Sequence, residues 1–215
     1  MTPIKHQISD KFLMGYAAGT LPEAFDLVIA THVSLSDDVR ARLESFEAVG
    51  GAVLDDIGPA ELADGSLEAT LARIKAMPET ARGPARRSTG VFPTPLQDVV
   101  GGDLDAVKWR SAGMGVKQCV LQSSKRASAR LLFIPAGQAM PKHSHKGSEL
   151  TLVLQGAFRD EDARFARGDI EVADQAMNHT PTAEDWADCI CLVAMDARLR
   201  FEALLPRIAQ RFLGI

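Results

Sequence analysis

Apolar residues in the first 77 positions recur at the three- and four-residue steps of amphipathic helices. We expect four helices there. Ser9 is placed to cap a short helix that Gly19 ends, and Pro22 suits the first turn of the second helix. Ser36 is expected to cap the third helix and Ser66 the fourth. The longest apolar stripe lies on the third helix, at Val39, Leu43, Phe46, Val49 and Val53.

The pattern changes twice beyond residue 77. Four prolines, two glycines and three arginines between 78 and 95 break any helical period, which predicts a basic linker. After it the period is near two, in short stretches separated by turn residues. These strand candidates are 116–121, 129–134, 149–155, 169–172 and 188–194. Many short strands with no helices between them indicate an all-β sandwich or barrel.

The fold class that follows is a multidomain α+β protein. We expect a helical domain over 1–77, the linker over 78–95 and an all-β domain over 96–215, whose apolar tail packs back on it. No apolar run reaches the about 18 residues of a membrane helix, and the N-terminus lacks the apolar core of a signal peptide. Three cysteines are too few and too uneven for a disulfide framework. We therefore expect a cytoplasmic protein with no membrane partner.

The net charge of −4 is unevenly distributed. Residues 1–77 contain six basic and twelve acidic groups, a balance of −6, whereas the remainder has 18 basic and 16 acidic groups. Such an acidic segment repels nucleic acid and attracts a basic protein, so we expect no direct nucleic-acid binding. An ordinary solvated helix surface would have the same composition.

The strand region contains a pattern of potential metal ligands. His143, His145 and Glu149 share parity, so within a continuous strand they face one side of a sheet. A second strand places His179 eleven residues after Gly168. This arrangement resembles the two-part cupin motif, whose fold is a jelly-roll barrel. The second half departs from it at Asp174 and Ala176, where cupins usually have proline and glycine.

These four side chains are expected to hold one divalent metal, with zinc first and Fe, Mn or Ni as alternatives. The competing interpretation is ordinary surface or core histidine, but three of the five histidines in the chain occupy ligand positions of one pattern. Zinc closed by four protein ligands has no open position and is usually structural. A six-coordinate iron would leave two positions open, as an oxygenase requires.

Cys189 and Cys191 lie on one face of a strand candidate. Neighbouring same-face positions are too far apart for an unstrained disulfide, so we interpret both as core residues. Trp109 and Trp186 are also expected to pack in the core. We find no catalytic general base beyond the ligands, although an inward-facing Arg130 could be missed from sequence.

Several segments together resemble the ChrR family of cupin-containing anti-sigma factors. They are the run from Tyr16 to Phe25, the run from Ala30 to Leu35, the strand after Glu149, the run from Gly168 to Asp174 and the sequence around Asp188. The resemblance implies a cytoplasmic regulator whose helical domain binds an extracytoplasmic-function sigma factor. It further implies a cupin domain that governs release under singlet oxygen or related oxidative stress, with zinc in both domains.

The chain departs from the family at the N-terminal zinc motif, which the resemblance places on two histidines and two cysteines. His6 and His32 remain, but Ser36 and Val39 stand at the cysteine positions. Valine is no ligand and serine a poor one, so we expect no zinc in this domain. Ser36 suits a helix cap and Val39 the apolar stripe of the third helix.

Three functional hypotheses follow. The first is an anti-sigma factor with a metal-binding cupin, which needs no catalytic residue. The second is a cupin metalloenzyme, such as a dioxygenase, with a helical extension. The third is a ChrR-like sensor that no longer binds a sigma factor. The extent of the N-terminal resemblance favours the first.

Overall fold

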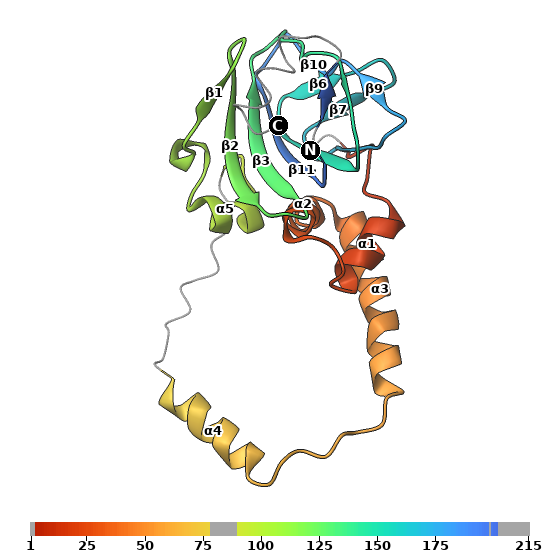
Figure 1. Cartoon of the computed structure of the whole chain (residues 1–215), viewed down its shortest axis with the longest axis vertical. Coiled ribbons are helices and arrows are strands. Elements are labelled where there is room, and N and C mark those ends of the chain that lie inside the picture. Colours follow the sequence, from red (N-terminus) through yellow and green to blue (C-terminus); the bar gives the residue numbers. More distant parts are fainter. Residues whose placement is uncertain (1–2, 78–89, 198, 202–215) are drawn as a thin grey trace.

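The computed structural model describes residues 3–77, 90–197 and 199–201, and shows a β-barrel with a helical N-terminal region beside it (Figure 1). The helices are α1 (Asp10–Ala17), α2 (Glu23–Val33), α3 (Asp37–Asp55), α4 (Ser66–Ala76) and α5 (Thr94–Val100), followed by a 3-10 turn at Leu104–Ala106. None of these helices is both long and apolar enough to span a membrane.

Three antiparallel sheets form the barrel. The large sheet has the order β1-β2-β3-β11-β5-β8, and two smaller sheets have the orders β10-β6-β7 and β12-β4-β9. The strands of the large sheet are β1 (Arg110–Gly113), β2 (Val116–Ser123), β3 (Ser128–Ile134), β5 (Glu149–Gln155), β8 (Ile170–Ala173) and β11 (Cys189–Met195). The others are β4 (His143–Ser144), β6 (Ala157–Arg159), β7 (Arg164–Ala166), β9 (Asn178–His179), β10 (Thr182–Ala183) and β12 (Arg200–Phe201). All five predicted strands are present, and the short strands of the smaller sheets were not predicted.

The helix starts agree with the sequence in part. Ser36 caps α3, since its hydroxyl accepts a hydrogen bond of 3.3 Å from the backbone N–H of Val39. Ser9 stands at the N-cap of α1 but makes no side-chain cap bond. The prediction for Ser66 was wrong by one position, because Gly65 is the N-cap of α4 and Ser66 is its first residue.

The α2 helix covers the outer face of the large sheet. Leu150, Leu152 and Leu154 of β5 are fully buried in one apolar cluster with Val28 and Ile29 of α2. Figure 1 shows α2 lying across the sheet beside β3 and β11. The sequence pattern predicted a helical domain over 1–77 that is separate from the all-β domain. Instead, the first helices and the barrel share one core, because both apolar faces would otherwise be exposed to water.

The predicted linker ends earlier than expected. Residues 78–89 lie outside the described part of the chain, but Phe92 is fully buried and α5 begins at Thr94. The Asp103 carboxylate accepts backbone hydrogen bonds from Val91 (2.8 Å) and Phe92 (3.1 Å). Pro95 lies in the first turn of α5, a position where a missing N–H costs nothing, so it starts a helix and does not prevent one.

Candidate metal centre

Three histidines converge inside the barrel from two of its strands. His143 lies on β4, His179 pairs with it across β9, and His145 follows β4. Nε2 of His179 lies 3.2 Å from Nε2 of His143 and 3.2 Å from Nε2 of His145. All three side chains are at least 95% buried. The sequence pattern therefore identified a real three-histidine cluster.

Each ring has its other nitrogen next to an acceptor. Nδ1 of His143 lies 2.9 Å from the carbonyl of Pro141, which only accepts, so this nitrogen holds the proton. Nδ1 of His145 lies 3.5 Å from Oε2 of Glu149, and Nδ1 of His179 lies 3.2 Å from Oε1 of Glu171. Neutral imidazoles in this arrangement therefore direct their three Nε2 lone pairs at one another.

The convergence of lone pairs fits a metal cation. Without one, three acceptors within hydrogen-bond distance of each other repel. Metal-bound histidines typically donate the remaining N–H to a carbonyl or carboxylate, which is what these three do. A metal about 2.1 Å from tetrahedral nitrogens separates them by roughly 3.4 Å, close to the two observed separations. The residues present therefore fit a divalent metal.

Glu149 lies beside the histidines, adjacent to but not within the tight cluster. Its Oε1 accepts a hydrogen bond of 3.0 Å from Thr151, while its buried Oε2 lies 3.5 Å from Nδ1 of His145. Burial raises the pKa of Glu149, but its interactions with His145, His143 and Thr151 outweigh burial, so the net pKa is lowered. Glu149 is therefore an anion at the edge of the cluster, with Oε2 next to His145.

Two acidic residues near the cluster were missed by the sequence analysis. Glu171 is 3% exposed and lies behind His179, and Oδ2 of Asp160 lies 3.4 Å from the same nitrogen. Glu171 faces the interior because it pairs across the sheet with Thr151, which shares the parity of Glu149. The inward orientation of Glu171 follows from the strand register, which cannot be obtained from the sequence alone.

The cysteines and tryptophans gave mixed outcomes. Cys189 and Cys191 are both buried with their sulfurs 3.6 Å apart, as free thiols in the core. Contact with Cys189, together with burial, raises the pKa of Cys191 well above its usual value, so it stays protonated. Trp109 packs against the core next to Phe133. The prediction for Trp186 was wrong, since it is 65% exposed.

The remnant of the N-terminal site is occupied by other interactions. Nε2 of His32 accepts a hydrogen bond from the backbone of Ile8, and the ring of His6 packs 4.6 Å from that of Phe165. Val39 is fully buried in the apolar core, and Ser36 caps α3. These four positions therefore do not fit a four-ligand zinc site, and the absence of zinc from it stays a prediction.

Comparison with known proteins agrees with this architecture. Residues 97–198 match the family described as the ChrR Cupin-like domain. The chain is 52% identical to the anti-sigma-E factor ChrR of Cereibacter sphaeroides over 212 residues, which cover 99% of each chain. A crystal structure of Rhodobacter sphaeroides SigE in complex with the anti-sigma ChrR covers 90% of this chain and 100% of its own, at 51% identity and a TM-score of 0.79. The chain therefore belongs to the ChrR family of anti-sigma factors.

Proposed function

We propose that this protein sequesters a sigma factor of the extracytoplasmic-function class through its N-terminal helices, in the cytoplasm. The metal-bearing barrel then governs release in response to oxidative stress such as singlet oxygen. Family membership supports the first part, since the related ChrR is seen in complex with SigE. Sequestration of a sigma factor is a regulatory function and needs no catalytic group.

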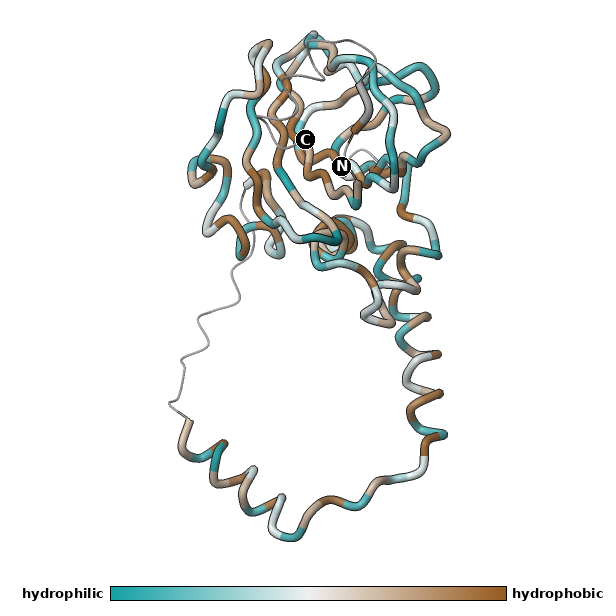
Figure 2. Tube along the Cα trace, in the orientation of Figure 1, coloured by the Kyte–Doolittle hydropathy of each residue, from teal (hydrophilic) through white to brown (hydrophobic). Residues whose placement is uncertain are grey.

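One observation supports the proposed binding surface. The apolar stripe of α3 is buried at Val39 and Leu43 but exposed further along, where Val49 and Val53 are more than 60% exposed. The stripe therefore continues past the point where this chain covers it. Figure 2 shows apolar residues along this outer half of α3.

The apolar surface extends into the next helix. No residue of α4 is buried, although it includes Leu67, Leu71 and Ile74. The segment between α3 and α4 exposes Ile57 and Leu62 as well. We name this whole region, residues 49–77, the apolar arm. It stands clear of the barrel in Figure 1. An exposed apolar region of this extent typically marks a protein-binding surface.

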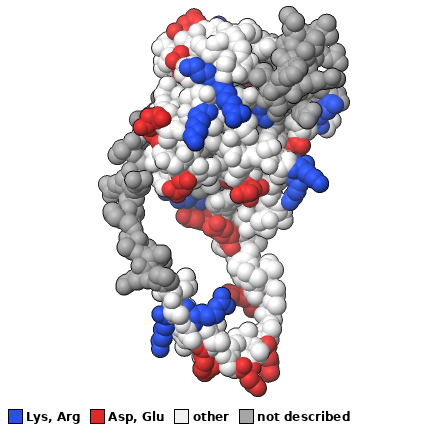
Figure 3. All heavy atoms as spheres, turned by 60° about the vertical axis from the view of Figure 1, so that its left-hand side comes forward, with Lys and Arg blue, Asp and Glu red and all other residues white. Residues whose placement is uncertain are grey.

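The negative charge of the N-terminal region also favours a basic partner. Residues 1–77 have a balance of −6, and acidic side chains gather at the far end of the apolar arm in Figure 3. A basic, DNA-binding partner is attracted to such a surface, and covering its polymerase- or DNA-facing side is sufficient for inhibition.

For the barrel, we propose that one zinc ion is held by His143, His145, His179 and Glu149. Glu149 would supply a carboxylate oxygen from beside His145. The metal, when bound, cross-links β4, β5 and β9 through neutral imidazoles and one carboxylate. Oxidation or displacement at these ligands would release that cross-link, and β5, which carries Glu149, belongs to the large sheet that α2 covers.

The sigma-binding proposal is tested with two substitutions in the apolar arm. Leu54→Asp with Ile74→Asp should abolish capture of the cognate sigma factor in a pull-down, because both apolar side chains are exposed on the proposed binding surface. Thermal stability should be unchanged for the same reason. Val120→Asp, at an exposed apolar position on β2, is the matched control. Full capture by the double variant would contradict the proposal.

The role of the barrel is tested separately. His143→Ala with His145→Ala should capture the sigma factor normally but fail to release it when singlet oxygen is generated. Release at the wild-type rate would exclude the barrel as the site that governs release.

A further inference from the structure

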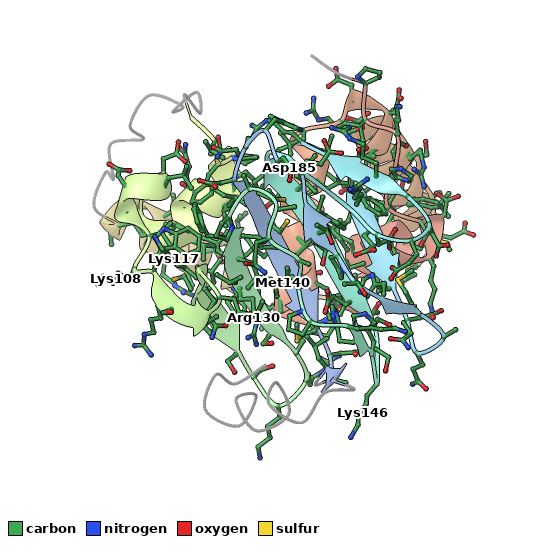
Figure 4. All side chains as sticks on the ribbon, turned by 90° about the horizontal axis from the view of Figure 1, so that it is seen from above. Lys108, Lys117, Arg130, Met140, Lys146 and Asp185 are labelled. Atoms are coloured by element: carbon green, nitrogen blue, oxygen red, sulfur yellow. The ribbon has the colours of Figure 1, made fainter. Side chains whose placement is uncertain are left out.

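A cavity lies inside the barrel beside the three-histidine cluster. It has a volume of about 450 Å³ and is bounded by the large sheet, the β1–β2 hairpin and the segment 139–141. This is within the roughly 300–1,000 Å³ of small-molecule sites. Figure 4 views the barrel from above, with Arg130 and Met140 near the centre. We name this space the barrel cavity.

Strand register divides the barrel cavity into a polar and an apolar part. Arg130 and Thr151 both pair with Val193, and Glu171 pairs with Thr151, so these three polar residues form one row across the sheet. Glu149 lies on the same strand two residues before Thr151. Two residues further along these strands, the next row of the same face contains the paired Cys191 and Leu132, and Val116 and Ile134 line the cavity beyond it.

Arg130 is the cation of the polar row. It is 2% exposed, and its guanidinium donates to Oε1 of Gln118 at 3.0 Å and to Oγ of Ser128 at 3.3 Å. These two bonds fix a planar, permanently charged group in a water-poor interior, where a charge-assisted hydrogen bond is strongest. Barrels do not need a buried arginine for stability, since an apolar residue of similar size costs less desolvation.

We propose that the barrel cavity binds a medium-chain aliphatic carboxylate, with its head at Arg130 and the metal centre and its chain along Leu132 and Ile134. The part played by the metal rests on the function proposed above. Among the charged groups that line the cavity, a divalent metal and Arg130 exceed the two carboxylates by one positive charge, which a monoanion balances. The remaining walls are apolar and suit a saturated chain.

Flexible apolar side chains line the entrance to the barrel cavity. Met114 is 64% exposed at the turn of the β1–β2 hairpin, and Met140 is half-buried in the segment opposite. Both line the barrel cavity. Methionine adapts to ligands of variable shape, so these residues allow a chain to enter without moving the sheet. Occupancy would connect the metal centre to an abundant class of small molecules.

The test is calorimetric titration of the full metal-loaded chain with decanoate and, separately, with 1-decanol. We expect one decanoate per chain. Val193→Phe fills the cavity from its middle row and should weaken decanoate binding by about tenfold or more, whereas Val172→Phe, on the outer face of β8 where it pairs with Leu150, should not. Arg130→Met should weaken decanoate by about tenfold but leave decanol unaffected, whereas Arg110→Met should change neither.

Three results would overturn the proposal. They are equal decanoate binding by Val193→Phe and Val172→Phe, equal affinity of the wild type for decanol and decanoate, and no binding at all. If Val193→Phe does not fold, methyl NMR of the wild type tests whether decanoate enters the cavity. Decanoate should shift the methyl signals of Met140 and Met195, which line the cavity, and not those of Met14 or Met77. Sigma capture by each folded variant without decanoate is measured alongside, so a failed ligand and a failed anti-sigma function give different results.

Discussion

The backbone N–H of Ile8 donates a hydrogen bond of 3.3 Å to Nε2 of His32, a fully buried side chain. This bond attaches the N-terminal segment to α2. Two residues earlier, the same segment is attached to the barrel, since the backbone of His6 donates to the carboxylate of Asp169 at 3.0 Å and accepts from Ile170. A histidine expected as the remnant of a metal site therefore has a structural role that requires its neutral form.

Acid should weaken the fold through His32. Burial lowers its pKa to about 4, against weaker opposing effects of Gly168 and Asp169. In the unfolded chain the ordinary pKa of about 6.5 applies, so between these values the unfolded state binds more protons and stability falls as the pH is lowered. Between pH 7 and pH 5 the contribution is about 2 kcal/mol.

Urea unfolding at those two pH values measures it. His32→Gln keeps an acceptor for Ile8 but does not titrate, so it should lose about 2 kcal/mol less than the wild type on acidification. His6→Gln leaves the Ile8–His32 bond in place and should behave like the wild type. Equal acid losses in all three proteins would exclude His32 as the source.

Metal content should be one equivalent per chain. His143→Ala with His145→Ala removes two of three converging nitrogens and should leave none, as measured by elemental analysis of purified protein. His6→Gln with His32→Gln should retain the full equivalent, because those residues are engaged elsewhere. An equivalent that persists in the first variant would show that His143 and His145 are not the ligands.

Glu171 should position His179. Its carboxylate lies 3.2 Å from Nδ1 of that ring and fixes the tautomer that presents Nε2. Glu171→Gln should therefore weaken metal retention by roughly 10–100-fold in a chelator competition. Glu161→Gln, at an exposed acid that accepts a hydrogen bond from the backbone of Thr180, should not change it. Unaltered retention in Glu171→Gln would show that His179 is oriented by Asp160 alone.

The first helices and the barrel should unfold together. Ile29 of α2 is fully buried in the cluster that includes Leu152 of β5. Ile29→Ala should cost about 3 kcal/mol, through lost burial and the cavity it leaves. It should lower the midpoint of helical and barrel signals equally, whereas Val49→Ala on the exposed half of α3 should change stability by less than about 0.5 kcal/mol. Separate transitions would show two independent units.

The sequence by itself determined the elements and the candidate ligand positions. Periods of 3.6 and 2 placed the first four helices and the central strands, because periodicity reports which face of each element is buried. The two-part spacing pattern identified the cluster of His143, His145 and His179, and short-range spacing along a strand fixes which side chains share a face. The Ser36 cap followed from local backbone chemistry alone.

Only the tertiary structure decided what those faces meet. The same apolar pattern in the sequence describes a residue that the rest of this chain buries, such as Val39, and one that stays exposed, such as Val53. The position of α2 on the sheet, and hence the shared core, depends on which two apolar faces come together. Glu171 and Arg130 face the metal centre through strand register, a relation between segments distant in sequence that no local pattern specifies.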